Sequence, residues 1–285
     1  MKTSYFIRNL ILIFTILISS MSQASHVVGS DINYVKTGNT YTFTLTIYRD
    51  CRGIPLNNQY IYVQNGNTSK AIQVTLKSIE DITPVCDTFV NAPCNPANTS
   101  GTSAGVEKHV YISLPLSVDS SAYTYLKNGT HFTVKWSQCC RNGAINTGSQ
   151  GNFYTEASVY NNVVGDNNSP FFYEMPFTKL HVNRAFRRNF GGFDIDGDSL
   201  SFELEDPLTN AGITTQYNSP YSKFKPLTVF EPTGVTSPNP NLNPPVGFHL
   251  NNQTGALTFT PVTQSEVTVI SLVVSEFRKG ILIGK

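Results

Sequence analysis

The sequence predicts an all-β protein made of two tandem antiparallel β-sandwiches that follow a cleaved signal peptide. Three observations support this fold class. Apolar and polar residues alternate with a period of two in several segments, and turns rich in asparagine and glycine separate these segments. No segment after the first 24 residues carries the apolar stripe of a helix. Strands at regular spacing joined by such turns are typical of sandwiches.

The clearest predicted strand is YTFTLTIYRD, residues 41–50. Its residues at 41, 43, 45 and 47 are apolar and point to one face, while threonines fill most of the other face. The same pattern predicts strands in HFTVKW (131–136), with Trp136 inward, in LSFEL (200–204) and in GALTFTP (255–261). VTVISLVV (267–274) is apolar on both faces, so we expect it in the centre of a sheet.

The N-terminus has the three parts of a secretory signal peptide. Lys2 and Arg8 precede an apolar stretch from 10 to 18, and Ser22-Gln23-Ala24 forms a small-residue cleavage site. The apolar stretch is short for a membrane span, although an uncleaved anchor helix is the alternative. We therefore expect residues 1–24 to be removed and the protein to be extracellular or held on the outer cell surface.

The charge of the mature chain argues against nucleic acid and anionic membranes as partners. The full chain of 285 residues carries a net charge of +1, and losing Lys2 and Arg8 brings it to −1. A near-neutral, evenly mixed surface has no electrostatic means of holding a polyanion. No second long apolar run follows residue 24, so we expect no direct membrane insertion after cleavage.

Two domains fit the mature chain, one over residues 25–164 and one over 165–285. Residues 165–176 form a polar segment that reads as a linker. Residues 232–247 are rich in proline and asparagine and predict an extended surface loop. SLVVSEFRKGILIGK (271–285) predicts a hairpin whose second arm has an unpaired edge. We therefore expect the second domain to be truncated at its C-terminal end, as in the N-terminal portion of a longer chain.

All five cysteines lie in the first predicted domain, and an exported protein should oxidise them where geometry allows. Cys86 and Cys94 are close enough in sequence to close a small loop. Cys51 follows one strand, and the pair Cys139-Cys140 follows another. Because neighbouring strand residues face opposite ways, we expect Cys51 to bond to one of that pair. The other is then free, vicinally bonded or paired differently. A metal–thiolate site is disfavoured because there is no CxxC spacing.

No catalytic constellation emerges, so we expect a protein that is not an enzyme. GTSAG (101–105) places Ser103 at the centre of a G-x-S-x-G pattern, but no strand precedes it and no helix follows it. The five histidines are scattered, and none has the spacing of a metal-binding motif.

The segment FDIDGDSLSF (193–202) concentrates three carboxylates, Asp194, Asp196 and Asp198, within five positions. Such a cluster can bind calcium, which prefers several oxygen ligands. Alternatively, Arg184, Arg187 and Arg188 just upstream neutralise it, or it is simply a polar Asp-Gly turn. An EF-hand is excluded because its sixth position is serine and an alternating strand follows. We therefore expect Asp194, Asp196 and Asp198 to bind a calcium ion.

Two resemblances point to a family. DIDGDSLSFEL (194–204) and GFHLNNQTGALTFTP (247–261) resemble, in that order, two motifs of bacterial cadherin-like and immunoglobulin-like modules. SHVVGSDINY, YTFTLTIYRDCRGIP and WSQCCRNGAI resemble the mature N-terminus of large exported Bacteroidetes surface proteins, several of which carry a gliding-motility-associated sorting domain. These 285 residues depart from the pattern in that we expect no sorting domain among them.

The resemblance implies an adhesin-like surface protein exported by the type IX route. It implies a non-enzymatic structural or adhesion module, connected with gliding motility or surface attachment, whose partner is a surface protein or a glycan. The alternative is a carbohydrate-binding or glycan-processing surface protein, although the single tryptophan, Trp136, has the pattern of a core residue.

Overall fold

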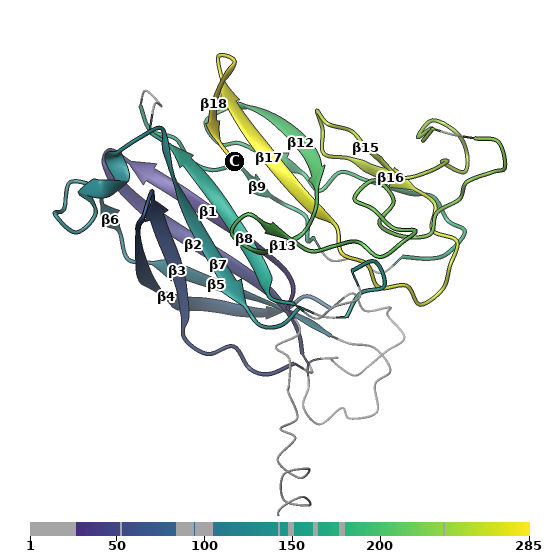
Figure 1. The fold of residues 1–285 in the computed structure, drawn as a ribbon, viewed down its shortest axis with the longest axis horizontal. Helices are drawn as coiled ribbons and strands as arrows, with labels where there is room; N and C mark the ends of the chain where they lie inside the picture. The colour runs from purple at the N-terminus through teal and green to yellow at the C-terminus, as the bar shows by residue number, and fades with distance from the viewer. Residues whose placement is uncertain are drawn as a thin grey trace, which may run out of the picture.

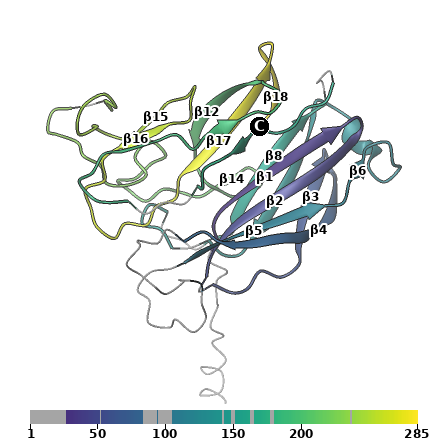
Figure 2. The same ribbon diagram turned by 180° about the vertical axis from the view of Figure 1, so that it is seen from behind.

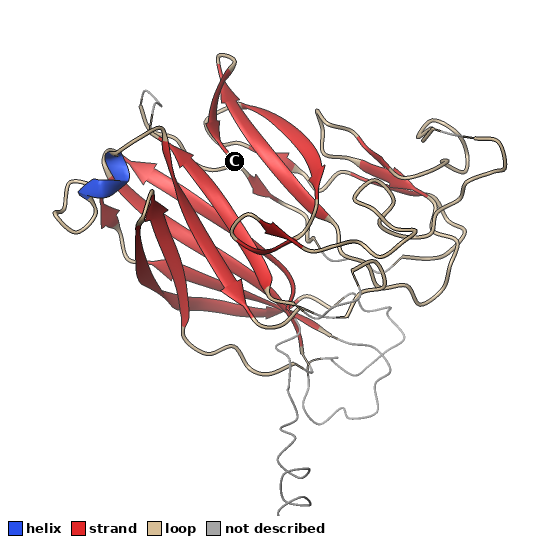
Figure 3. Ribbon diagram, viewed as in Figure 1, coloured by secondary structure: helices blue, strands red, loops and turns tan. Residues whose placement is uncertain are grey.

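The computed structural model describes residues 27–51, 53–83, 94, 105–141, 143–147, 151–161, 165–176, 180–235 and 237–285. It confirms the all-β fold with antiparallel pairing that the alternation predicts (Figures 1 and 3). The one helix among these residues is a 3₁₀ turn, Thr124–Lys127. Within the same residues no helix has the length and apolar character needed to cross a membrane. The signal peptide, Cys86 and Ser103 lie outside the described residues.

The first half of the chain forms seven neighbouring strands of one large sheet. Their order is β1-β2-β5-β4-β3-β7-β8, and a short β6 also pairs with β2. The bounds are Val27–Thr37 for β1, Thr40–Asp50 for β2, Gln59–Asn65 for β3, Thr68–Asp81 for β4, Val106–Ser113 for β5, Leu116–Ser117 for β6, His131–Gln138 for β7 and Phe153–Tyr160 for β8.

The alternation in these strands creates the first core. The inward side chains of β2, Phe43 and Leu45 among them, are fully buried, and those of β7 include Phe132 and Trp136. Trp136 Nε1 donates a hydrogen bond to Gln59 Oε1 at 2.9 Å, which satisfies the one polar atom of this buried ring. The prediction that Trp136 is a core residue is therefore confirmed.

The second half contributes shorter strands and a separate cluster of buried apolar side chains, among them Phe190, Leu257 and Phe259. The bounds are Phe171–Phe172 for β9, Phe186–Arg188 for β10, Gly192–Phe193 for β11, Ser199–Glu205 for β12, Leu208–Asn210 for β13, Ile213–Thr214 for β14, His249–Leu250 for β15, Leu257–Phe259 for β16, Ser271–Arg278 for β17 and Ile281–Gly284 for β18. The strand predicted from 267 begins only at 271, and β17 lies between β12 and β18, as its apolar pattern predicts. The described residues of the 232–247 segment, 232–235 and 237–247, form a loop without named strands.

The large sheet continues from the first half into the second, in the order β8-β18-β17-β12. Gly284 of β18 pairs with Glu276 of β17 on one side and with Val159 of β8 on the other. Ser158 and Lys285 exchange two main-chain hydrogen bonds, of 2.7 and 3.1 Å. The expectation of an unpaired second arm in this hairpin was wrong, because β8 from the first half pairs with it.

The segment at 165–170 is not the exposed linker that its polar composition suggests. It lies along the outer edge of β1, where Tyr34 N donates to Ser169 Oγ at 2.8 Å and Ser169 N donates to Tyr34 O at 2.9 Å. Asn167 is buried as well. Polar residues are needed here because they supply hydrogen bonds to a strand edge. The division into two domains at this segment stays a prediction.

Candidate functional site: a buried acidic cluster

The three aspartates lie in a tight turn between β11 and β12. Asp194 Oδ1 accepts hydrogen bonds from the main-chain N–H groups of Asp196 and Asp198, both at 2.9 Å. Gly197 has a φ of +81°, a conformation that favours glycine. The sequence motif DIDGD therefore builds the turn itself, since Asp194 closes it and Gly197 allows the chain to reverse.

The three carboxylates do not converge, which corrects the expectation that all three share one ion. Asp196 turns toward the 165–170 segment and accepts hydrogen bonds from the main-chain N–H of Asn168 at 2.7 Å and from its side-chain amide at 3.0 Å. Asp198 turns toward β17, where Arg278 Nε donates to its carboxylate at 2.9 Å. Only Asp194 and Asp198 remain in a common cluster.

The third member of that cluster is Glu276 of β17, which the sequence analysis did not single out. Asp194, Asp198 and Glu276 each offer a carboxylate oxygen, and these oxygens lie within 4.8 Å of one another. Asp194 is 6% exposed and Glu276 is 0% exposed. Asp194 Oδ2 and Glu276 Oε1 are buried without a hydrogen-bond partner among the described residues. Unpaired buried carboxylate oxygens are costly, and a proton, a cation or a bound water molecule can satisfy them.

The electrostatics of the cluster follow from its burial. Desolvation raises the pKa of Glu276 to about 8, while the Asn167 amide works in the opposite direction. The charges of Asp194 and Asp198 and a side-chain hydrogen bond with Asp194 raise this pKa further. Burial likewise raises the pKa of Asp194. Asn167 Nδ2 donates to Glu276 Oε2 and to the Tyr34 hydroxyl, both at 3.1 Å. Negative charge is therefore unfavourable here unless something positive accompanies it.

The arginine that meets the acidic turn is Arg278 of β17 and not one of the three upstream arginines. Arg278 pairs with Asp198 and lies 3.8 Å from Asp196, and its Nη2 donates to Asn167 Oδ1 at 2.7 Å. Arg184, Arg187 and Arg188 form no ion pair with these carboxylates among the described residues. Arg187 donates to main-chain oxygens of the 232–247 loop, and Arg188 pairs with Glu174.

The donor set fits a calcium ion in part. Calcium takes six to eight oxygen ligands, which carboxylates, main-chain carbonyls and water can supply. Asp194 and Glu276 offer free oxygens aimed into the cluster, whereas Asp198 is already shared with Arg278. Asp194 and Glu276 would therefore hold the ion. Asp198 would contribute a carboxylate oxygen while it stays paired with Arg278. A proton on Glu276 is the competing way of satisfying the same oxygens.

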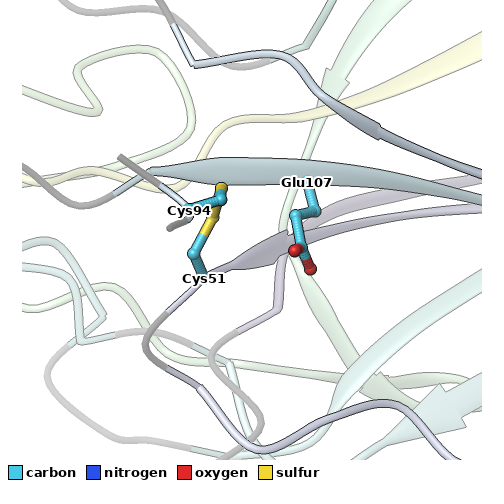
Figure 4. Close-up of side chains that lie close together, drawn as sticks. All are labelled: Cys51, Cys94 and Glu107. Carbon is cyan, nitrogen blue, oxygen red and sulfur yellow. A yellow bond between two sulfur atoms is a disulfide. The ribbon is translucent and has the colours of Figure 1, made fainter. Parts of the chain in front are cut away.

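A second group with metal-binding residues is Cys51, Cys94 and Glu107, but its sulfurs are bonded to each other. Figure 4 shows the Cys51–Cys94 disulfide beside the Glu107 carboxylate. Glu107 accepts hydrogen bonds from Arg49 Nη2 at 2.6 Å and from the His109 ring at 2.9 Å when that nitrogen is protonated. Because disulfide sulfur is a poor metal ligand, this group is a structural cross-link.

The cysteine pairing differs from the one expected. Cys51 is bonded to Cys94, and Cys139 is bonded to its neighbour Cys140. The prediction of a bond from Cys51 to one of the adjacent pair was wrong, and so was the alternative of a loop closed by Cys86 and Cys94. Cys94 comes from a segment without a strand pattern, so sequence alternation could not place it beside the end of β2.

The structure also gathers exposed aromatic rings that the sequence analysis did not consider. Phe171, Tyr173 and Phe193 contact one another with ring centroids 5.0–5.8 Å apart on β9, β11 and the residue after β9. Tyr173 is 70% exposed and Phe193 44% exposed. The run FFYE at 171–174 was the available signal, since three consecutive aromatic residues cannot all face one core. This aromatic patch adjoins the acidic turn along the chain.

In comparisons with known proteins, no family model, curated protein or solved structure matches the chain.

Proposed function

We propose that this protein is a non-enzymatic exported module of the bacterial cell surface, with a structural or adhesive role, and that a calcium ion held by Asp194, Asp198 and Glu276 stiffens it. Export is supported by the signal-peptide pattern of residues 1–24. A structural role is supported by the disulfides and by a β-rich architecture built around two apolar cores. Calcium is abundant outside cells, where weakly binding structural sites are common.

The observation that carries the proposal is the pair of unpartnered carboxylate oxygens on Asp194 and Glu276 at a place where several parts of the chain meet. The cluster is contacted by Tyr34 of β1 through Asn167, by the acidic turn and by Arg278 of β17. An ion bound here therefore holds together segments that are far apart in sequence. A cation that binds only the folded state stabilises that state by mass action.

The test is thermal unfolding of the protein lacking residues 1–24, in millimolar calcium and in chelator. We expect calcium to raise the melting temperature, because a ligand at a hundred times its Kd adds about 2.7 kcal/mol to the free energy of unfolding. Glu276→Gln and Asp194→Asn should each remove most of this increase. Asp196→Asn is the matched control, because Asp196 belongs to the same turn but faces Asn168, and it should keep the response.

A melting temperature that is the same in calcium and in chelator would contradict the calcium site and leave a protonated Glu276 as the explanation. An equal loss of the response in Asp196→Asn and Glu276→Gln would contradict the assignment of the ion to the inner side of the turn, because Asp196 faces Asn168. The surface role is tested separately by fusing residues 1–24 to a reporter enzyme that is active only outside the cytoplasm. Reporter activity in a bacterial host is expected, and its absence would contradict export.

A second candidate function is glycan binding by the aromatic patch. Exposed Tyr173 and Phe193 present ring faces and edges to solvent, and apolar sugar faces can pack on such rings. Glycan-array binding that is lost in Tyr173→Ala and Phe193→Ala, but kept in Tyr60→Ala on the exposed face of β3, would favour this function. An array without any bound glycan would leave the structural role alone.

A further inference from the structure

A polar pocket lies on the outer face of β3, β7 and β8, away from the first core. Its volume is about 330 Å³, at the lower end of the range for small-molecule sites. Ala211, in the turn between β13 and β14, lines it on the side of the second half. Figure 1 shows β13 beside β8, and Figure 2 shows β1 and β2 on the opposite side of the first half. Polar side chains make up most of the lining, namely Gln64, Thr130, His131, Thr133, Lys135 and Glu156.

Strand alternation and register place two opposite charges in this pocket. Val134 of β7 is fully buried in the first core, so its neighbours Thr133 and Lys135 point outward. Lys135 lies opposite Tyr62 of β3 on one side and opposite Glu156 of β8 on the other. Residues paired in this way have adjacent side chains on one face of a sheet. The pocket therefore contains a cation and an anion on neighbouring strands.

Lys135 and Glu156 are nevertheless bonded to other partners, and the described residues include no ion pair between them. Lys135 Nζ donates a hydrogen bond to Gln64 Oε1, on the β3 side. The hydroxyl of Tyr154, a residue only 8% exposed, donates to Glu156 Oε2. An ammonium group has three donors and a carboxylate has two acceptor oxygens, so each group keeps free hydrogen-bonding capacity. Since both residues line the pocket, this capacity is available to a ligand.

The far end of the pocket is held in place by further side-chain contacts. Asn65 Nδ2 donates to the main-chain oxygen of Leu126 at 3.2 Å, which ties the end of β3 to the segment before β7. Thr130 Oγ1 and His131 Nδ1 share a hydrogen bond of 3.1 Å. The His131 ring also stacks on Tyr160, with ring centroids 5.2 Å apart. A pocket whose walls are already ordered loses less conformational entropy when a ligand binds.

The lining favours one class of ligand over three others. An anion would meet the carboxylate of Glu156, a cation would meet the ammonium group of Lys135, and an apolar molecule would leave both without water. A sugar hydroxyl both donates and accepts hydrogen bonds, so neighbouring hydroxyls can accept from Lys135 and donate to Glu156. Tyr62, which is 44% exposed and adjacent to Lys135, offers a ring on which the apolar face of a sugar can pack.

We propose that this pocket binds a neutral hexose unit of a glycan. Two neighbouring hydroxyls of the sugar lie between Lys135 and Glu156, and the apolar face of its ring packs on Tyr62. The contacting residues come from β3, β7 and β8, so the site is separate from the acidic cluster and from the aromatic patch. It goes beyond the structural role proposed above, because it gives the module a glycan ligand that needs no calcium.

The test is an NMR titration of the ¹⁵N-labelled protein lacking residues 1–24, in the presence of chelator. The probes are the methyl glycosides of glucose, galactose and mannose, together with the uronic acid and the 2-amino form of each sugar. We expect at least one neutral glycoside to shift the amide signals of Thr133, Lys135 and Glu156 in a saturable way. The charged forms of that sugar should bind at least about tenfold more weakly, because each meets a like charge and loses a hydrogen bond to a charged group.

Matched variants locate the binding. Lys135→Ala and Glu156→Ala should each weaken it by about tenfold, the equivalent of one hydrogen bond to a charged group. Lys77→Ala on β4 and Glu203→Ala on β12 remove exposed strand residues of the same charge and should leave the affinity unchanged. Tyr173→Ala, in the aromatic patch, should leave it unchanged as well. If a pocket variant does not fold, the signals that shift in the wild-type protein still locate the site.

Three results would overturn the proposal. The first is the absence of saturable shifts at Thr133, Lys135 and Glu156 with all three glycosides. The second is a charged form that binds as tightly as its neutral sugar. The third is binding that persists in Lys135→Ala and is lost in Tyr173→Ala, which would assign the sugar to the aromatic patch. Because chelator is present throughout, these results are distinguishable from a failure of the proposed calcium site.

Discussion

Glu276 is the side chain on which the acidic cluster depends most, because it is fully buried and carries an unpartnered carboxylate oxygen. Its side chain packs closely against β18 on one side. A Cβ atom added to Gly284 on the neighbouring strand would collide with Glu276 Oε2. Glycine at 284 is therefore required for the close approach of β18 to this carboxylate.

Gly284→Ala should accordingly lower the free energy of unfolding, by about 1–3 kcal/mol, since overpacking of a filled site costs this much. Urea unfolding checks the prediction. An unchanged midpoint would mean that the Glu276 side chain can move away freely and that the cluster is not held in place.

A pH prediction belongs to Asp31 on β1, which is remote from the acidic turn in sequence. Burial raises the pKa of Asp31 to about 6, although a hydrogen bond from Thr46 and the charge of Lys108 work against this increase. The folded state therefore retains a proton that the unfolded chain releases near pH 4. The contribution of Asp31 to stability is complete below about pH 4 and is lost as the pH rises through about 6.

Asp31→Asn removes this titration. The difference in unfolding free energy between the variant and the wild type should change between pH 4 and pH 6 and be flat above pH 7, as measured by urea unfolding across that range. A difference that is constant over the whole range would contradict a raised pKa for Asp31.

The sequence predicts the part of the site that is built from neighbouring residues, but not the part that is formed by strand pairing. Asp194 and Gly197 build their turn from neighbours in the chain, so the DIDGD motif is readable directly. Glu276 reaches Asp194 only because β17 pairs with β12, and that register is a property of the folded sheet. The usable signal was a single carboxylate in the otherwise apolar, strand-like run SLVVSEF.

Among the elements, those with strict alternation were predictable and those completed by distant partners were not. β2 and β12 follow the period of two and lie where the sequence places them. Residues 165–170 look like a linker because they are polar, yet they bond the edge of β1. The arm 281–284 looks unpaired because its partner, β8, lies more than a hundred residues earlier.

The disulfide at the end of β2 gives a prediction at the scale of elements. Cys51 and Cys94 are 43 residues apart, so their bond constrains a long loop of the unfolded chain. Cys51→Ser and Cys94→Ser should each destabilise the protein by about 2–4 kcal/mol, and the double variant should be no worse than either. Chemical denaturation measures this. Additive losses, or peptide mapping that finds Cys51 bonded to another cysteine, would contradict the pairing.

At the scale of the whole molecule, one continuous sheet and the 165–170 segment join the two halves. Two predicted domains separated by a flexible linker would unfold independently, whereas halves that share strands unfold together. Trp136, the single tryptophan, reports on the first core. Its fluorescence should therefore follow the same transition as the far-ultraviolet circular dichroism of the whole chain. Two separated transitions would show that the halves are independent.

Asn167 is the side chain that connects the two halves at the acidic cluster, through Tyr34 on one side and Glu276 on the other. Asn167→Ala should cost about 1–3 kcal/mol of unfolding free energy, because it leaves buried groups without partners. Asn168→Ala is the more exposed control and should cost less. An equal loss in both variants would mean that the connection has no special role.

The most direct test of the calcium site is a crystal structure of the protein grown with calcium. We expect an anomalous difference peak at about 2.3–2.6 Å from carboxylate oxygens of Asp194 and Glu276, with the ion inside the cluster. A cluster without any peak beside these oxygens would contradict the account. A proton shared between the two carboxyl groups would then satisfy the oxygens that we assign to calcium.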